Sequence, residues 1–159
     1  MERFPIQTEY VNPHYAEYGC YASTLAYIAW RMSKSPCPDA SLVEAIIDEA
    51  VKEGIVKDNA VSIRSGCEWW RAYVTDPVKY IALAARFFGV RNIDAIEVYR
   101  GVPCEIRAPA NASIVEWKTR SGSHFTLGDG HLPGRIIYDP WPGLSRGMVK
   151  TYRHWRVSC

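Results

Sequence analysis

The sequence is short of three features, and each absence excludes a class of protein. No stretch approaches the run of about 18 uncharged apolar residues that a membrane-spanning helix needs, and the first residues lack the apolar segment of a signal peptide. The charge is nearly balanced, with 19 basic and 17 acidic residues, so binding to nucleic acid or to an acidic membrane is not expected. Because no two cysteines form a Cys-x-x-Cys pair, we expect no structural zinc site.

The cysteines are odd in number, which does not fit a framework of disulfides. We therefore expect the chain to remain in the reducing cytoplasm, without a metal or another cofactor. The five cysteines are Cys20, Cys37, Cys67, Cys104 and Cys159.

Hydrophobic residues make up 48% of the 159 residues and charged residues 23%, a composition typical of one globular domain over 1–159. Residues 1–18 are rich in proline and aromatic side chains and are predicted to be irregular. The apolar spacing then predicts three helices. Their expected ranges are 19–32, from Asp39 or Ser41 to Gly54, and from Asp76 to Gly89.

Local signals support the ends of these helices. Ser41-x-x-Glu44 fits a capping box at the start of the second helix. Asp76 followed by Pro77 is typical of a helix start, and a glycine after the last turn is typical of a helix end.

After the third helix the pattern changes to short strands separated by Gly, Pro and Asn-Ala. The predicted strands cover about 93–99, 112–118, 123–128, 134–139 and 147–156. Helices followed by strands predict an α+β fold in which N-terminal helices pack on a C-terminal antiparallel β-sheet.

Cys20 is the first candidate catalytic residue. It opens the predicted helix 19–32, where the helix dipole favours negative charge and hence the thiolate, the nucleophilic form of cysteine. Gly19 beside it would let a substrate carbonyl approach the backbone. The alternative is a buried cysteine that only packs in the core.

His124 is the candidate base. It lies in the alternating segment Ser123-His124-Phe125-Thr126-Leu127, which suits the start of a strand beside a cleft. His131, in a predicted hairpin tip, is a poorer place for a rigid base. The alternative for His124 is a strand histidine without a catalytic role.

Asp139 is the candidate residue that orients the base. It follows His124 by 15 residues across a predicted hairpin, so the outer ends of the two paired strands bring the side chains together. The alternative is that Asp139-Pro140-Trp141-Pro142-Gly143 is simply a turn.

In this order, the motifs Tyr18-Gly19-Cys20-Tyr21, Ser123-His124-Phe125 and Asp139-Pro140 resemble those of the papain-like cysteine peptidase superfamily. The chain is most similar to the double-glycine leader peptidase domains of bacteriocin exporters and to small phage-borne papain-like proteins. The resemblance implies a papain-like fold with Cys20 as nucleophile, His124 as base and Asp139 as the orienting residue.

The sequence departs from that family at the oxyanion hole. The family usually has a glutamine about six residues before the nucleophile, and this chain has His14 there. Gln7 lies thirteen residues upstream of Cys20 and could reach the site if the intervening residues loop out. Gln7 and His14 are therefore both candidate oxyanion donors, with Asn12 as a further alternative.

Aromatic residues are the candidate walls of a substrate groove. Trp141 directly follows Asp139-Pro140, and Tyr21 directly follows Cys20. Trp69 and Trp70 are further candidates, and core packing is an equally good explanation for each.

These observations predict a cysteine hydrolase that cleaves an amide or peptide bond through Cys20, His124 and Asp139. Two alternatives remain: a papain-like binding or adaptor module without turnover, and a cell-wall peptide amidase or endopeptidase. The expected partner is a peptide or peptide-like substrate, and the oligomeric state is left open. Two contacts are predicted, from Cys20 to His124 and from His124 to Asp139.

Overall fold

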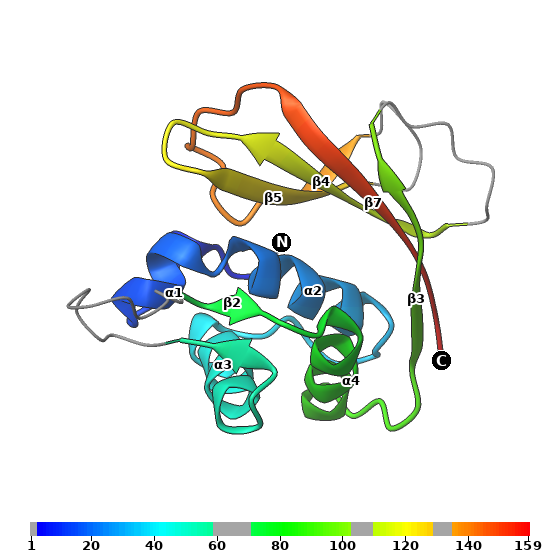
Figure 1. The fold of residues 1–159 in the computed structure, drawn as a ribbon. Coiled ribbons are helices and arrows are strands. Elements are labelled where there is room, and N and C mark those ends of the chain that lie inside the picture. Colours follow the sequence, from blue (N-terminus) through cyan, green and yellow to red (C-terminus); the bar gives the residue numbers. More distant parts are fainter. Residues whose placement is uncertain (1–2, 59–70, 103–109, 129–134) are drawn as a thin grey trace.

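The computed structural model describes residues 3–58, 71–102, 110–128 and 135–159. Helices form one layer and an antiparallel sheet forms the other, as Figure 1 shows. This is the predicted α+β class with helices first in the chain. None of the helices in the described ranges has the length and the apolar character needed to span a bilayer.

The three predicted helices are confirmed, with small changes at their ends. They are α2 (Cys20–Arg31), α3 (Ala40–Lys52) and α4 (Pro77–Phe87). Asp39 caps α3 by accepting a hydrogen bond from the Leu42 amide, so the prediction of a capping box at Ser41 is wrong. The hydroxyl of Ser41 instead donates to Asp39, and the Glu44 carboxylate accepts from the backbone of Asn12.

The described part of the predicted irregular segment 1–18, residues 3–18, is more regular than predicted. It contains a 3-10 turn, η1 (Gln7–Glu9), and a short helix, α1 (Pro13–Tyr18). The side chain of Asn12 caps α1 by accepting from the His14 amide, and Pro13 occupies its first position. Sequence periodicity missed α1 because a helix of six residues is too short to repeat an apolar pattern.

The sheet has five antiparallel strands in the order β3-β7-β4-β5-β6. Their bounds are β3 (Asp94–Gly101), β4 (Ala112–Lys118), β5 (Ser123–Gly128), β6 (Ile136–Tyr138) and β7 (Val149–Ser158). All five lie where strands are predicted, with ends that differ by a few residues. A separate pair, β1 (Val56–Lys57) and β2 (Tyr73–Val74), lies beside the helices, as Figure 1 shows.

Helix α2 is the centre of the core, because it packs against α4 on one side and β5 on the other. Leu25, Ala26 and Ala29 are fully buried along it. The hydroxyl of Thr24 donates to the Cys20 carbonyl at 2.8 Å and also contacts the Phe125 carbonyl of β5 at 3.5 Å. This packing holds the start of α2 against the strand that carries His124.

The first residues of the chain lie along the end of β6. The Gln7 amide donates to the Pro140 carbonyl at 2.8 Å, and the Tyr138 hydroxyl donates to the Pro5 carbonyl at 2.7 Å. The ring of Phe4 packs edge-on against Tyr138, with their centroids 5.3 Å apart. These contacts place Gln7 next to the residues that follow β6.

Candidate active site

The structure joins His124 and Asp139 as predicted. Nε2 of His124 lies 2.7 Å from Oδ1 of Asp139, and the two side chains are 1% and 12% exposed. Because Asp139 holds Nε2, Nδ1 is the nitrogen that remains for a reaction with the thiol. Asp139 both orients the ring and forms the turn that was its alternative interpretation, since it also accepts from the Trp141 amide at 2.9 Å.

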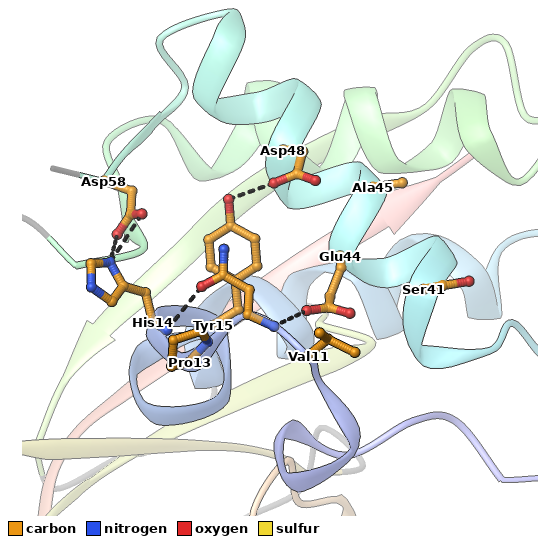
Figure 2. Close-up of a pocket in the computed structure, with 10 residues that line it drawn as sticks. Val11, Pro13, His14, Tyr15, Ser41, Glu44, Ala45, Asp48 and Asp58 are labelled. Atoms are coloured by element: carbon orange, nitrogen blue, oxygen red, sulfur yellow. Dashed lines mark hydrogen bonds and ion pairs between the residues drawn. The ribbon is translucent and has the colours of Figure 1, made fainter. Parts of the chain in front are cut away.

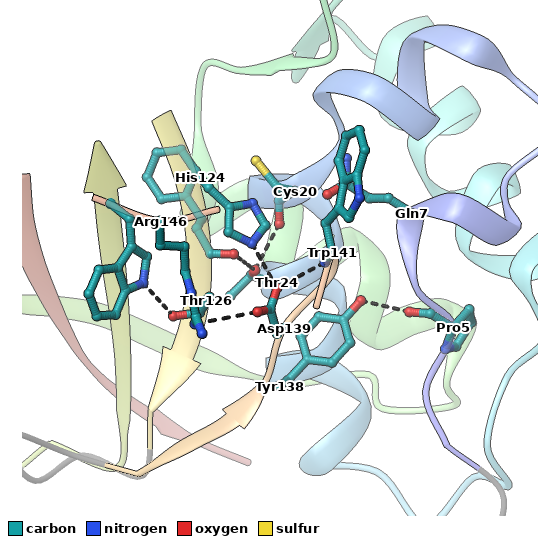
Figure 3. A network of polar contacts seen from close by, with 12 residues as sticks. Pro5, Gln7, Cys20, Thr24, His124, Thr126, Tyr138, Asp139, Trp141 and Arg146 are labelled. Carbon is teal, nitrogen blue, oxygen red and sulfur yellow. Dashed lines mark hydrogen bonds and ion pairs between the residues drawn. The ribbon is translucent and has the colours of Figure 1, made fainter. Parts of the chain in front are cut away.

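Asp139 is charged in this setting. Burial alone would raise its pKa, but the hydrogen bonds from His124 and from the Trp141 amide outweigh burial. The guanidinium of Arg146, 3.4 Å from Oδ2, adds to their effect. Together these groups hold the pKa of Asp139 below its ordinary value. Figure 3 shows this network.

Cys20 lies at the first position of α2 and is 8% exposed. In the view of Figure 3, the ring of His124 lies between the Cys20 sulfur and the Asp139 carboxylate. Within the described residues no hydrogen bond joins Cys20 to His124, and the predicted contact between the two stays a prediction. The thiol instead faces the backbone of Phe125, the residue after His124.

The thiol is neutral at rest, which differs from the expectation that the helix terminus favours the thiolate. Burial raises the pKa of Cys20 to about 11. The backbone groups of Phe125, Tyr21 and Cys20 act in the opposite direction, and the Asp139 charge adds to the increase. Desolvation of a thiolate at this position therefore outweighs the stabilisation that the start of α2 provides.

Gly19 is required for a reason that the sequence did not reveal. A Cβ atom at this position would lie 2.5 Å from the carbonyl oxygen of Tyr15 in α1. The backbone amide of Gly19 donates to the same oxygen at 2.9 Å. Glycine therefore allows α1 and α2 to meet at the residue before the nucleophile.

Gln7 lies near the site, but its side-chain amide is not oriented as the expected oxyanion donor. Its Nε2 donates to the carbonyls of Tyr15 and Ala16, both at 3.2 Å. Its Oε1 is buried and has no hydrogen-bond partner in the described part of the chain. In this conformation the amide nitrogen is not free to donate to an oxyanion.

His14 lies elsewhere. Its Nδ1 pairs with Asp58 at 3.0 Å, in a pocket formed mainly by α1 and α3 that Figure 2 shows. Asn12 caps α1 and lines the same pocket. Cys20 does not line it, so the structure does not bring His14 or Asn12 to the thiol as oxyanion donors.

A groove of about 460 Å³ runs between the helical layer and the sheet, with Cys20 in its wall. Tyr21, a predicted wall of a substrate groove, lines this groove, and its ring packs on Phe125 with centroids 4.7 Å apart. Trp141 is half-buried beside Asp139 and does not line the groove. Trp69 and Trp70 lie outside the described residues.

The sequence did not single out three charged residues of this region. Arg146 pairs with Asp139 from the loop before β7, and Glu116 of β4 pairs with Arg153 of β7. Only Glu116 carried a signal, because a carboxylate in the apolar strand Ile114-Val115-Glu116-Trp117 is unusual in a core position. The pairing itself depends on the strand order.

No known protein family, curated protein or solved structure matches this chain.

Proposed function

We propose that the protein is a cysteine hydrolase with a papain-like arrangement of Cys20, His124 and Asp139, acting on an amide bond of a peptide. The observation that carries this proposal is the hydrogen bond of 2.7 Å between His124 Nε2 and Asp139 Oδ1, at the strand that packs against the start of α2. A buried histidine held by a charged carboxylate, next to a cysteine at a helix start, is the arrangement that thiol catalysis requires.

The reaction begins from a neutral thiol. Nδ1 of His124 takes the proton from Cys20 as the sulfur bonds to the carbonyl carbon of the substrate. The carbon–nitrogen bond then breaks, and the imidazolium returns the proton to the leaving amine. Water then attacks the thioester, and His124 takes its proton and passes it to the Cys20 sulfur. This step releases the carboxylic acid product and restores the thiol.

The negative oxygen of the tetrahedral intermediate needs hydrogen-bond donors. The first-turn amides of α2 are the best candidates, since the backbone of Cys20 and Tyr21 already lies against the thiol. Gln7 joins them only if its amide turns, which requires its nitrogen to leave the carbonyls of Tyr15 and Ala16.

Three features favour the second candidate function, a binding module without turnover. The thiol is buried and neutral, it makes no hydrogen bond with His124, and the Gln7 nitrogen is engaged elsewhere. A site that binds a peptide without cleaving it would tolerate all three features.

Acetylation by p-nitrophenyl acetate separates the two functions. In a hydrolase, Cys20 forms an acetyl thioester faster than the other four cysteines, and the thioester then hydrolyses, as peptide mapping by mass spectrometry would show. His124→Ala should slow the reaction by about 10²–10⁴-fold. His14→Ala is the matched control, because His14 pairs with Asp58 away from the groove. Equal acetylation of all accessible thiols, unchanged by His124→Ala, would favour the binding module.

A further inference from the structure

The groove beside Cys20 contains a charged cluster that the proposed reaction does not use. Its walls come from the start of α2, from β2 and from four strands of the sheet. The sheet wall carries Glu116 of β4 and Arg153 of β7, and the helical wall carries Tyr21. Tyr21 directly follows Cys20, so this cluster lies next to the residue that attacks the substrate.

Glu116 is not available to a ligand, because its carboxylate is already saturated. Oε1 accepts from the Ser123 hydroxyl at 2.8 Å and lies 3.2 Å from Lys150 Nζ. Oε2 accepts from Thr151 at 2.8 Å and from Arg153 at 2.9 Å. A cationic ligand would find no free acceptor here, and Glu116 instead fixes the position of Arg153.

Arg153 is fixed on a second side by aromatic rings. Its guanidinium lies 5.0 Å from the ring centroid of Tyr21 and 4.9 Å from that of Phe125. The side chain is 15% exposed, so it has little freedom to move into solvent. A guanidinium that is stacked and held by one carboxylate is pre-organised to bind a second acceptor.

Two polar atoms of this cluster lack a well-formed hydrogen bond. Nε of Arg153 and the hydroxyl of Tyr21 are both buried without one inside the described ranges, although the Arg153 guanidinium lies close enough to interact with that hydroxyl. A buried polar atom without a partner is unfavourable, and a ligand oxygen that reaches it removes this penalty. The unpartnered N–H of Arg153 is a donor and the hydroxyl can donate, so the missing ligand atom is an acceptor.

We propose that this cluster is a specificity site for a carboxylate on the substrate, bound by Arg153 and Tyr21 next to Cys20. This proposal rests on the proposed function for its role in catalysis, although binding itself does not require turnover. The carboxylate comes either from an acidic side chain or from a free peptide C-terminus. Two further arginines line the groove, Arg100 and Arg71, and Arg100 is already paired with Glu97 at 2.5 Å.

Binding of short peptides to the full chain with Cys20→Ser tests the proposal without interference from turnover. The probes are acetyl-Gly-Glu-Gly-amide, its glutamine counterpart, and acetyl-Gly-Gly-Gly with a free carboxylate. We expect one carboxylate peptide to bind at least tenfold more tightly than the neutral glutamine peptide by titration calorimetry. The stronger of the two acids identifies the source of the carboxylate.

Variants assign the preference to the cluster. Arg153→Met keeps much of the packing on the two rings and removes the donors, so the preference should fall by at least tenfold. Arg156→Met is the matched control, because Arg156 is exposed on the same strand. If Arg153→Met unfolds because Glu116 loses its guanidinium partner, the double variant Arg153→Met/Glu116→Gln removes both charges. Tyr21→Phe should weaken binding of the acidic peptide a few-fold and leave binding of the neutral peptide unchanged.

The proposal is overturned if acidic and neutral peptides bind equally, or if Arg156→Met lowers the preference as much as Arg153→Met does. A failure of the proposed function is a different result. Acetylation of Cys20 by p-nitrophenyl acetate involves no carboxylate on the reagent. If that reaction does not occur, the proposed hydrolase function is wrong, but the measured preference for a carboxylate still supports the specificity site.

Discussion

The protonation state of the Cys20 thiol sets the reactivity of the candidate site. Burial keeps the proton on sulfur, whereas the carboxylate of Asp139 is charged and holds Nε2 of His124. The resting site is thus a neutral thiol beside a base that is already oriented. Catalysis from this state requires His124 to remove the thiol proton when the substrate binds, because only a small fraction of Cys20 is thiolate beforehand.

The alkylation of Cys20 by iodoacetamide should therefore be slow at neutral pH. The pKa of Cys20 is about 11, so its thiolate population at pH 7 is smaller by about 10²-fold or more than that of an unperturbed cysteine with a pKa near 8.5. The rate should rise about tenfold for each pH unit between 7 and 10. Mass spectrometry can follow all five cysteines in one experiment.

The exposed Cys159 is the internal control for this experiment. Alkylation of Cys20 that is faster than that of Cys159 at pH 7, with a plateau below pH 8, would contradict the neutral thiol. It would show instead that His124 takes the proton at rest. His124→Ala would then slow the alkylation, whereas for a neutral resting thiol it should change the rate little.

At the scale of elements, the junction of α1 and α2 determines where Cys20 lies. The two helices are separated by Gly19 alone, whose backbone contacts the Tyr15 carbonyl of α1. The same carbonyl accepts from Gln7, so η1, α1 and α2 meet at one oxygen atom.

Replacement of Gly19 by alanine should push these helices apart. The new Cβ would meet the Tyr15 oxygen at 2.5 Å, and overpacking of this kind costs about 1–3 kcal/mol of unfolding free energy. Urea denaturation measures the loss. Acetylation of Cys20 should fall as well, since the thiol moves with α2.

Gly143→Ala is the matched control, because a Cβ there would meet no atom within 4 Å. Its effect should stay within about 0.5 kcal/mol. Equal stability of the two variants would show that the junction adjusts without strain.

The elements with strong local signals were predictable from the sequence. Asp76-Pro77 and the apolar spacing after it placed α4, and the 15-residue separation of His124 and Asp139 placed their contact. The contact of Gln7 with α1 was not predictable, because it depends on a short helix without an apolar repeat. The pKa of Cys20 was not predictable either, since burial is a property of the packed molecule.

At the scale of the whole molecule, the cluster around Glu116 joins strands that are far apart in the sequence. Arg153 lies 37 positions after Glu116, and they meet because β7 pairs with β4. No local pattern encodes that pairing, so the sequence could not reveal the cluster. Because the cluster is held by the charged carboxylate of Glu116, we expect the stability of the fold to depend on pH.

Glu116 should contribute stability that depends on pH. Burial alone would raise its pKa, but the hydrogen bonds from Thr151, Ser123 and Arg153 outweigh burial and lower the pKa to about 2 from an ordinary value of 4.5. Since the folded value lies below the unfolded one, the contribution is complete above pH 4.5 and is lost as the pH falls towards 2.

The variant Glu116→Gln should therefore be less stable at pH 7 by about 1.5–3 kcal/mol, the range for hydrogen bonds to charged groups. The difference from the wild type should shrink between pH 4.5 and 2, which urea denaturation at several pH values can measure. Glu49→Gln is the control, because Glu49 forms an exposed pair with Lys52 on α3. A difference that stays constant with pH would show that Glu116 acts through packing rather than charge.

The strand order also sets when the protein can acquire its site during synthesis. Strand β7 lies between β3 and β4, although both precede it in the chain. A nascent chain on the ribosome can therefore form the helical layer first, whereas β3 stays unpaired until β7, its neighbour among the described strands, has been synthesised. Sheets built from distant segments form slowly. The Cys20 thiol therefore lacks the cover of Phe125 until β5 has been synthesised, and Arg153 can reach the groove only after β7 has been made.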